Sequence, residues 1–142
     1  METVKNSIKK HEGFRNKVYK DTLGKRTIGY GHLCVEDWWE DDKEYTQAEL
    51  ERIFDKDFDK AKEGASKLYE GCEINDTAKG VIIEMVFQLG TTGVSKFKNM
   101  WKALKETPPN YSVAKIEMLD SRWAKQTPNR AKELSNTIGG MV

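Results

Sequence analysis

Two carboxylates near the beginning of the chain, Glu12 and Asp21, are the residues best suited to do chemistry. Glu12 closes a predicted helix, where the negative end of the helix dipole and any burial favour a protonated carboxyl group. Asp21 begins the turn Asp21-Thr22-Leu23-Gly24, a polar setting that favours the ionised form. One protonated and one ionised carboxyl group facing a cleft are what hydrolysis of a glycosidic bond requires. Solvated residues also commonly occupy helix ends and turns, so position alone leaves both interpretations open.

Other chemistries find little support in the sequence. It contains neither a nucleophile elbow nor a His-Glu-x-x-His motif, and no Lys-Ser/Thr pair follows the glycines of residues 27–32, as a phosphate loop would need. Cys34 and Cys72 have only His11 and His32 as further soft ligands, which indicates neither a disulfide scaffold nor a zinc site. The 24 Lys and Arg against 23 Asp and Glu leave a net charge of +1, which disfavours general binding to nucleic acid or to a membrane surface. We therefore expect no metal and no cofactor.

The elements that position the two carboxylates fit one compact domain, since the chain has 142 residues of which 37% are hydrophobic. The spacing of apolar residues predicts a helix over residues 3–12, which Gly13 stops. Residues 14–33 are rich in β-formers with a turn between them, which predicts a small hairpin with a third short strand. A capping box at residues 46–49 opens a long helix that reaches residue 68.

The second half of the chain is predicted to be helical with short breaks. Asn75 or Asp76 caps an almost wholly apolar core helix that ends at Gly90. Ser112 caps a further helix, and Pro128 occupies the first position of the last one. A small sheet followed by a helical region gives an α+β fold.

The connection before the long helix contains two adjacent tryptophans, Trp38 and Trp39, in an acidic segment. Such a pair either contacts a sugar or packs to cover a lobe, and we favour packing. The acidic residues of segment 36–63 are interleaved with cations, as on a solvated helix face. A helical adaptor built on this acidic segment is an alternative function, but it leaves the hairpin motif unexplained.

Three blocks of sequence resemble the phage-type (bacteriophage T4-like) lysozymes. The first combines His11-Glu12-Gly13 with residues 18–33, and the others span residues 85–94 and 121–131. The resemblance implies a lysozyme-like α+β fold with a small β-sheet lobe and a helical lobe joined by a long helix. The implied single domain covers residues 1–142, with the sheet lobe at 13–45, the connecting helix at 46–68, and the helical lobe at 1–12 and about 65–142.

The activity that this resemblance implies is hydrolysis of the β-1,4 bond between N-acetylmuramic acid and N-acetylglucosamine in peptidoglycan, with inversion, for lysis of a host cell. Glu12 then corresponds to the general acid, Asp21 to the second catalytic carboxylate, and Thr27 to the hydroxyl that helps to hold the attacking water. Arg130 corresponds to an arginine that pairs with the catalytic glutamate.

The resemblance also implies supporting and substrate-binding residues. His32 and Asp57 match a buried ion pair, which we interpret as structural because such a pair stabilises a fold without touching substrate. Leu33, Phe87 and Gln88 match positions that contact the saccharide, although each also suits a core residue that lines a cleft.

Two positions depart from the family pattern, because Met100 stands where a serine is expected and Glu117 where an asparagine is expected. These changes keep open a catalytically silent peptidoglycan-binding protein with the same fold. The expected partner is peptidoglycan, with no nucleic acid and no membrane insertion, and we expect a monomer. The beginning of the chain lacks the apolar region of a secretory signal, so we expect synthesis in the host cytoplasm and release through a separate pore former.

Overall fold

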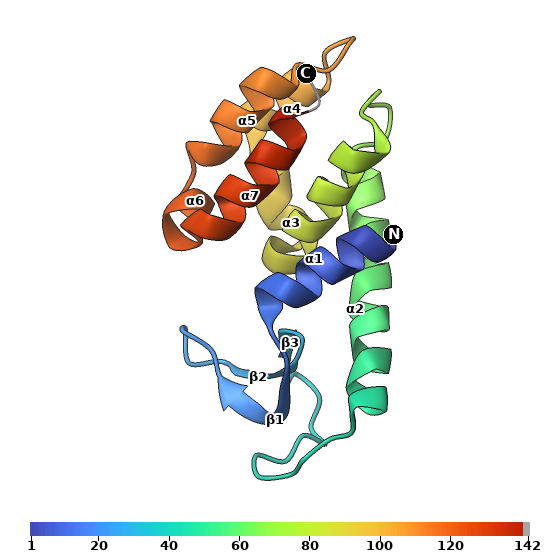
Figure 1. Cartoon of the computed structure of the whole chain (residues 1–142), viewed down its shortest axis with the longest axis vertical. Coiled ribbons are helices and arrows are strands. Elements are labelled where there is room, and N and C mark those ends of the chain that lie inside the picture. Colours follow the sequence, from blue (N-terminus) through green and yellow to red (C-terminus); the bar gives the residue numbers. More distant parts are fainter. Residues whose placement is uncertain (141–142) are drawn as a thin grey trace. The chain divides into compact units, whose positions relative to one another are not determined.

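The structure of the protein is a computed structural model, which describes residues 1–140 (Figure 1). Helices predominate, and they accompany one small antiparallel sheet, so the predicted lysozyme-like α+β class is confirmed. In chain order the elements are α1 (Glu2–Glu12), β1 (Arg15–Lys20), β2 (Arg26–Gly29), β3 (His32–Leu33), α2 (Gln47–Leu68), α3 (Asp76–Ser95), α4 (Lys98–Leu104), α5 (Tyr111–Leu119), α6 (Arg122–Gln126) and α7 (Pro128–Gly139).

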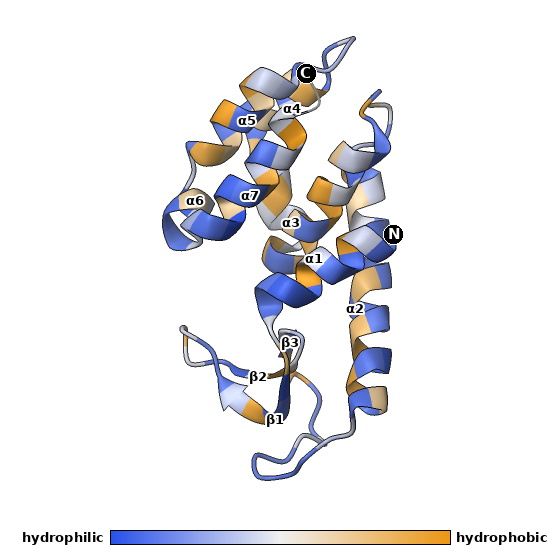
Figure 2. Cartoon of the chain, in the orientation of Figure 1, coloured by the Kyte–Doolittle hydropathy of each residue, from blue (hydrophilic) through white to orange (hydrophobic). Residues whose placement is uncertain are grey.

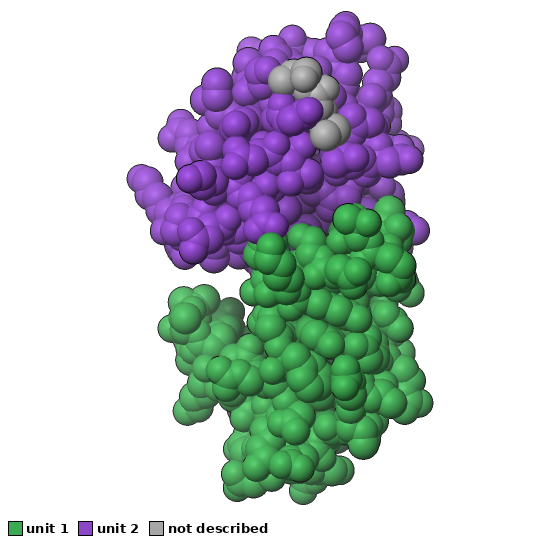
Figure 3. Space-filling view, in the orientation of Figure 1, with its two compact units in different colours: residues 1–60 green, residues 61–142 purple. Residues whose placement is uncertain are grey.

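The chain divides into two compact units, which Figure 3 colours separately. Unit 1 spans residues 1–60 and unit 2 spans residues 61–142, so the boundary falls within α2. Residues 1–12 group with the sheet in this division, whereas the sequence analysis assigned them to the helical lobe. The predicted division into lobes stays a prediction.

The sheet of unit 1 has the strand order β1-β2-β3, and both neighbouring pairs are antiparallel. Tyr19 pairs with Thr27, and Thr27 pairs in turn with Leu33 of the short third strand. The register between β1 and β2 is irregular from Arg15 to Tyr19, which marks a bulge before the turn. Both the expected hairpin and its third strand are therefore present.

The core of unit 1 lies between the sheet and the first part of α2. Ile28 of β2 and Leu50 of α2 form a buried cluster with Trp39 and Tyr45. Hydrophobic and hydrophilic residues alternate along α2 (Figure 2), as expected for a helix that buries one face. The predicted capping box begins this helix. The Glu49 amide donates a hydrogen bond to the Thr46 hydroxyl oxygen, and the same hydroxyl donates one to the Glu49 carboxylate.

Unit 2 is built around α3, whose residues Ala78 and Gly80 to Val86 are buried. Asn75 caps it by accepting a hydrogen bond from the Ala78 amide. The prediction that this helix ends at Gly90 is only half right. Gly90 has the non-helical angles φ 80° and ψ 161°, but the chain resumes helical structure and continues to Ser95. Gly90 therefore produces a kink, since a single residue with positive φ interrupts a helix without preventing its continuation.

The later helices of unit 2 pack on one another, with α5 against α4 and α7, and α7 also against α3 and α6. The predicted cap at Ser112 is wrong. Asn110 caps α5 instead, because its side chain accepts from the Val113 amide and the helix begins at Tyr111. Pro128 begins α7 as predicted.

Candidate active site

Glu12 is the last residue of α1, and it lies against the turn between β2 and β3. Gly13, with φ 72°, ends the helix, and its amide donates to the Lys9 carbonyl over 2.9 Å. A Cβ atom at Gly31 would collide with Glu12 Oε1, and Gly31 itself has φ +75°. The absence of a side chain at Gly31 therefore makes room for the Glu12 carboxyl group.

The helix that carries Glu12 is tied to α2 within unit 1. Lys9 Nζ donates to both carboxylate oxygens of Glu51, at 2.9 and 3.1 Å, and the Tyr30 hydroxyl donates to the same carboxylate over 3.1 Å. The hydrogen bond from Lys9 lowers the pKa of Glu51, which keeps this carboxylate ionised at neutral pH. Tyr30 also contacts Phe14, with ring centroids 5.0 Å apart, so the chain on both sides of Glu12 is held.

Asp21 is oriented by its own turn. Its Oδ1 accepts hydrogen bonds from the Leu23 and Lys25 amides, at 2.9 and 2.8 Å. Two amides on one oxygen fix the plane of the carboxylate. Within residues 1–140, no hydrogen bond reaches the other oxygen, Oδ2, which is therefore able to accept one from a water molecule.

Thr27 lies in β2 with only 3% of its surface exposed. Its hydroxyl donates to the Lys25 carbonyl over 3.0 Å, which uses the only proton of the group. The hydroxyl oxygen still has lone pairs with which to accept a hydrogen bond. Its predicted role in holding a water molecule requires such an acceptor.

Tyr19 is a residue that the sequence analysis missed. Burial raises the pKa of the Tyr19 hydroxyl, the negative charge of Glu12 raises it further, and Asp21 adds to the effect while Arg15 opposes it. Tyr19 therefore lies within electrostatic reach of both predicted catalytic carboxylates, and it pairs with Thr27 across the sheet. A signal was present in the sequence, because Tyr19 lies only two residues before Asp21.

His32 stands between two carboxylates in unit 1. Its Nδ1 is 2.7 Å from Asp57 Oδ2, and its Nε2 is 2.9 Å from Glu36 Oε1. The contact expected between His32 and Asp57 is present, whereas Glu36 was not predicted. Glu36 Oε1 also accepts from Trp39 Nε1 over 2.6 Å, which connects this group to the core.

The protonation of this cluster differs from that of isolated side chains. Burial lowers the pKa of His32, but the hydrogen bonds and charges of Asp57 and Glu36 outweigh it, so the pKa is raised above 6.5. Burial raises the pKa of Glu36, but the hydrogen bonds from His32 and Trp39 outweigh it, so that pKa is lowered below 4.5. The charged forms of both side chains are therefore favoured in the folded protein.

These shifts predict how stability depends on pH. The contribution of His32 is complete below pH 6.5 and is lost as the pH rises through its raised pKa. The contribution of Glu36 is complete above pH 4.5 and is lost as the pH falls through its lowered pKa. We expect Glu36→Gln to lower the free energy of unfolding by about 1 kcal/mol near pH 5.5 and by clearly less near pH 9. Urea unfolding at pH 5.5 and pH 9 measures the free energy of unfolding, and Asp37→Asn, at an exposed neighbouring residue, is the control. A Glu36→Gln chain that loses the same stability at the two pH values would contradict the prediction.

In unit 2, Arg130 of α7 forms a buried ion pair with a residue that the sequence analysis missed. Arg130 Nε donates to Glu84 Oε2 over 2.9 Å, and both side chains are buried. An acidic residue in the middle of an almost wholly apolar helix was the available signal for Glu84. The predicted pairing of Arg130 with Glu12 would join the two units, and it stays a prediction.

The predicted saccharide contacts lie in both units. Leu33 is 42% exposed in unit 1, as a contact residue must be, and Phe87 is half-buried in α3 of unit 2. Gln88 accepts a hydrogen bond from Trp123 Nε1 over 2.8 Å and donates to Thr127 Oγ1 over 3.4 Å. Both ends of its amide are thus occupied within unit 2. The roles of these three residues in binding substrate remain predictions.

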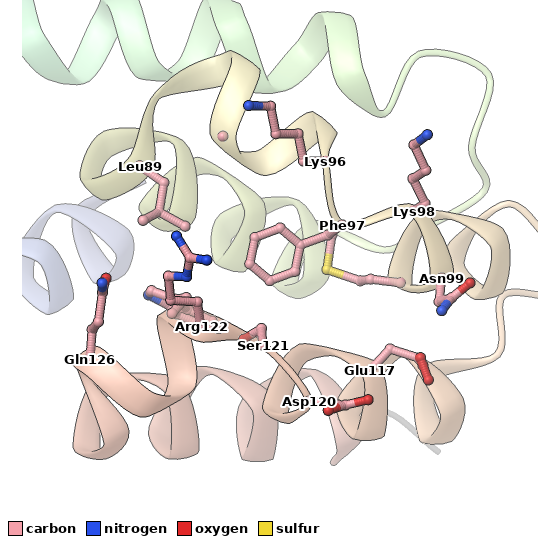
Figure 4. A pocket seen from close by; sticks show the side chains of 13 residues that line it. Leu89, Lys96, Phe97, Lys98, Asn99, Glu117, Asp120, Ser121, Arg122 and Gln126 are labelled. Carbon is pink, nitrogen blue, oxygen red and sulfur yellow. The ribbon is translucent and has the colours of Figure 1, made fainter.

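A pocket of about 550 Å³ in unit 2 contains both positions at which the chain departs from the family pattern (Figure 4). Met100 and Glu117 line it, and Figure 4 shows Glu117 and Asp120 along one side with Lys96 and Lys98 on the other. The pocket therefore offers charges of both signs around an apolar interior. This pocket belongs to unit 2 alone and includes none of the predicted catalytic residues.

Among the described residues, 1–140, no helix combines the length and apolar character that crossing a membrane requires. No three His, Cys, Asp or Glu side chains among them are grouped so that they would hold a metal ion.

Comparison with known proteins identifies relatives along nearly the whole chain. Residues 9–137 match the family model described as phage lysozyme. Probable T4-type lysozyme 2 of Dictyostelium discoideum is 30% identical, over 93% of this chain and 91% of its own length. Probable T4-type lysozyme 1 of the same organism is also 30% identical, over 96% of this chain and 93% of its own length. The pre-baseplate central spike protein Gp5 of Enterobacteria phage T4 is 29% identical over 92% of this chain but only 26% of its own length.

Proposed function

Since the chain belongs to the phage lysozyme family, with a lysozyme-like function, we propose that it is a muramidase. Its substrate is peptidoglycan, in which it hydrolyses the β-1,4 bond between N-acetylmuramic acid and N-acetylglucosamine. The observation that best supports this proposal is the arrangement of the two carboxylates in unit 1. Glu12 lies in the space left by Gly31, and two backbone amides of the hairpin turn hold Asp21 Oδ1 while its Oδ2 is left to accept a hydrogen bond.

In the proposed mechanism Glu12 protonates the oxygen of the departing sugar, and water attacks the anomeric carbon. Asp21 Oδ2 accepts a proton from the attacking water, while Asp21 Oδ1 remains on the turn amides. Thr27 accepts a hydrogen bond from the same water through its hydroxyl oxygen. The local structure supports these two roles, because the turn amides fix Asp21 and the absence of a side chain at Gly31 leaves room for Glu12.

We propose that the reaction inverts the anomeric configuration. Inversion requires the two carboxyl groups to be about 6.5–9.5 Å apart, so that a water molecule fits between one of them and the sugar. The two backbone amides on Oδ1 hold Asp21 in one orientation and leave Oδ2 available to a water molecule. Proton NMR of the first product formed distinguishes the outcomes, since an inverted anomer supports the proposal and a retained one contradicts it.

Asp21→Asn tests the role of the second carboxylate. The amide cannot accept the proton of the attacking water, so we expect the rate of hydrolysis to fall by about 10²-fold or more. Clearance of a peptidoglycan suspension measures the rate, and Asp42→Asn, an exposed acid in the same unit, is the control. Unchanged activity of Asp21→Asn would reject this assignment.

A catalytically silent peptidoglycan-binding protein is the competing function. The changed positions Met100 and Glu117, which line the pocket of unit 2, keep it open, whereas the presence of Glu12, Asp21 and Thr27 argues against it. A zymogram on purified peptidoglycan separates the two functions. Cleared bands with release of reducing sugar support the muramidase. Retention of the protein on sedimented peptidoglycan without reducing sugar would support the silent binder.

We also propose that the enzyme is made in a host cytoplasm, acts as a monomer and reaches the wall through a lesion made by a separate pore former. Induction of the chain in bacteria, with and without a pore-forming protein, tests this route. Lysis only when both are present is the expected result. Lysis by the chain alone would contradict the requirement for a pore former.

A further inference from the structure

A second pocket, in unit 1, lies where the acidic connection before α2 meets the first turns of that helix. Its volume is about 390 Å³, within the range of small-molecule sites. The residues that line it include Trp38, Trp39, Lys43, Glu49, Arg52 and Lys56, and we call it the tryptophan pocket. None of the predicted catalytic or saccharide-contacting residues lines it.

The aromatic wall of the tryptophan pocket has a fixed and an exposed part. Trp39 is only 7% exposed, donates to Glu36 and packs edge-on against Tyr45 with ring centroids 4.9 Å apart. Trp38 contacts Trp39, with centroids 6.1 Å apart, yet it is 59% exposed. The favoured prediction of packing therefore holds for Trp39 and fails for Trp38. An exposed indole ring on a rigid base is suited to stacking against the face of a sugar ring.

The charges that line the tryptophan pocket are mostly positive, although the surrounding segment is acidic. Arg52 and Lys56 are four residues apart on α2 and so share a face, an arrangement that costs stability when the charges are alike. In the part of the chain that the structure describes, neither of them forms an ion pair. Glu49, the acid that lines the pocket, accepts from the Thr46 hydroxyl at the helix cap. The pocket is therefore short of negative charge.

We propose that the tryptophan pocket binds a carboxylate-bearing sugar of a peptidoglycan strand, as an anchoring site distinct from the catalytic residues. The sugar ring stacks on Trp38, and the carboxylate of its substituent bonds to Arg52 and Lys56. The choice of peptidoglycan rests on the proposed function. The stacking surface and the paired cations are features of the pocket itself.

Sedimentation with insoluble peptidoglycan measures binding by the site. Every variant compared also carries Glu12→Gln, so that the polymer is not hydrolysed during the measurement. We expect Trp38→Ala and the double variant Arg52→Gln/Lys56→Gln each to raise the apparent Kd about tenfold. The double variant Lys60→Gln/Lys62→Gln is the matched control, since it removes two exposed cations from the same helix outside the pocket. Equal binding by the pocket variants and this control overturns the proposal. Thermal melting checks that the exposed substitutions leave the fold intact.

The chemistry of the ligand is tested with modified peptidoglycan. Converting its carboxylates to neutral amides is expected to weaken binding by the unsubstituted pocket about tenfold and to leave the Arg52→Gln/Lys56→Gln variant unaffected. Binding that persists on the amidated polymer, or that disappears when phosphate polymers of the wall are stripped away, overturns the assignment to a peptidoglycan carboxylate.

Failure of this site and failure of the proposed function are distinguishable. In the chain that retains Glu12, pocket variants are expected to clear insoluble peptidoglycan more slowly but to hydrolyse a short soluble fragment at the normal rate. Pocket-dependent binding by a chain that hydrolyses neither substrate would reject the muramidase and keep the site. Normal hydrolysis of both substrates by the pocket variants would reject the site and keep the muramidase.

Discussion

Glu12→Gln is expected to lower the rate of peptidoglycan hydrolysis by about 10³-fold, because the amide has no acidic proton to give to the departing sugar oxygen. The substitution preserves the size and shape of the side chain that lies beside Gly31. We therefore expect the melting temperature to change by no more than about 3 °C. Clearance of a peptidoglycan suspension measures the loss of activity, and thermal unfolding measures the stability.

The matched control for this prediction is Glu2→Gln, which makes the same chemical change in the first turn of the same helix. It is expected to keep full activity. A Glu12→Gln chain that clears peptidoglycan as fast as the control would reject Glu12 as the general acid. Loss of activity together with a large drop in melting temperature would show instead that Glu12 supports the fold.

Gly31→Ala is expected to lower activity by about 10²-fold, because a displacement of about 1 Å in a catalytic group costs that much. The new methyl group would overlap Glu12 Oε1, and the end of a flexible side chain moves away easily. The collision itself therefore costs little stability. The positive φ of Gly31 adds about 1–2 kcal/mol of backbone strain for any residue with a Cβ atom.

Gly71→Ala separates these two effects. Gly71 has nearly the same backbone angle, φ +80°, but nothing lies within 4 Å of a Cβ atom at that position. Both variants are expected to lose similar stability, and only Gly31→Ala is expected to lose activity. Equal activity of the two variants, measured below their melting temperatures, would mean that the Glu12 carboxyl group does not need its place beside Gly31.

The predictions from sequence succeeded where the signal was local. The cap at Thr46, the stop at Gly13 and the hairpin around Asp21 depend on residues within a few positions of one another, and all three are present. The cap of α5 was misplaced from Asn110 to Ser112 because both residue types suit a cap and only the packing of the helix decides between them.

The parts of the candidate site that escaped prediction depend on contacts across the fold. The contact of Glu36 with His32 was missed, because nothing in the sequence indicates that this acid of the connecting segment turns toward the histidine. The contact of Asp57 with His32 was predicted from the family resemblance alone. Tyr19 was missed because its relation to Glu12 appears only when α1 and the hairpin are placed together. The Trp38 and Trp39 pair divides between surface and core because Glu36 fixes only one of the two rings.

The attachment of α1 to α2 through Lys9, Glu51 and Tyr30 has a kinetic consequence for the last residue of α1. The conformational entropy of this helix end is lost when unit 1 folds, so the proton donor needs little further ordering when a glycan strand arrives. More of the binding free energy then remains to distort the scissile sugar toward its transition state.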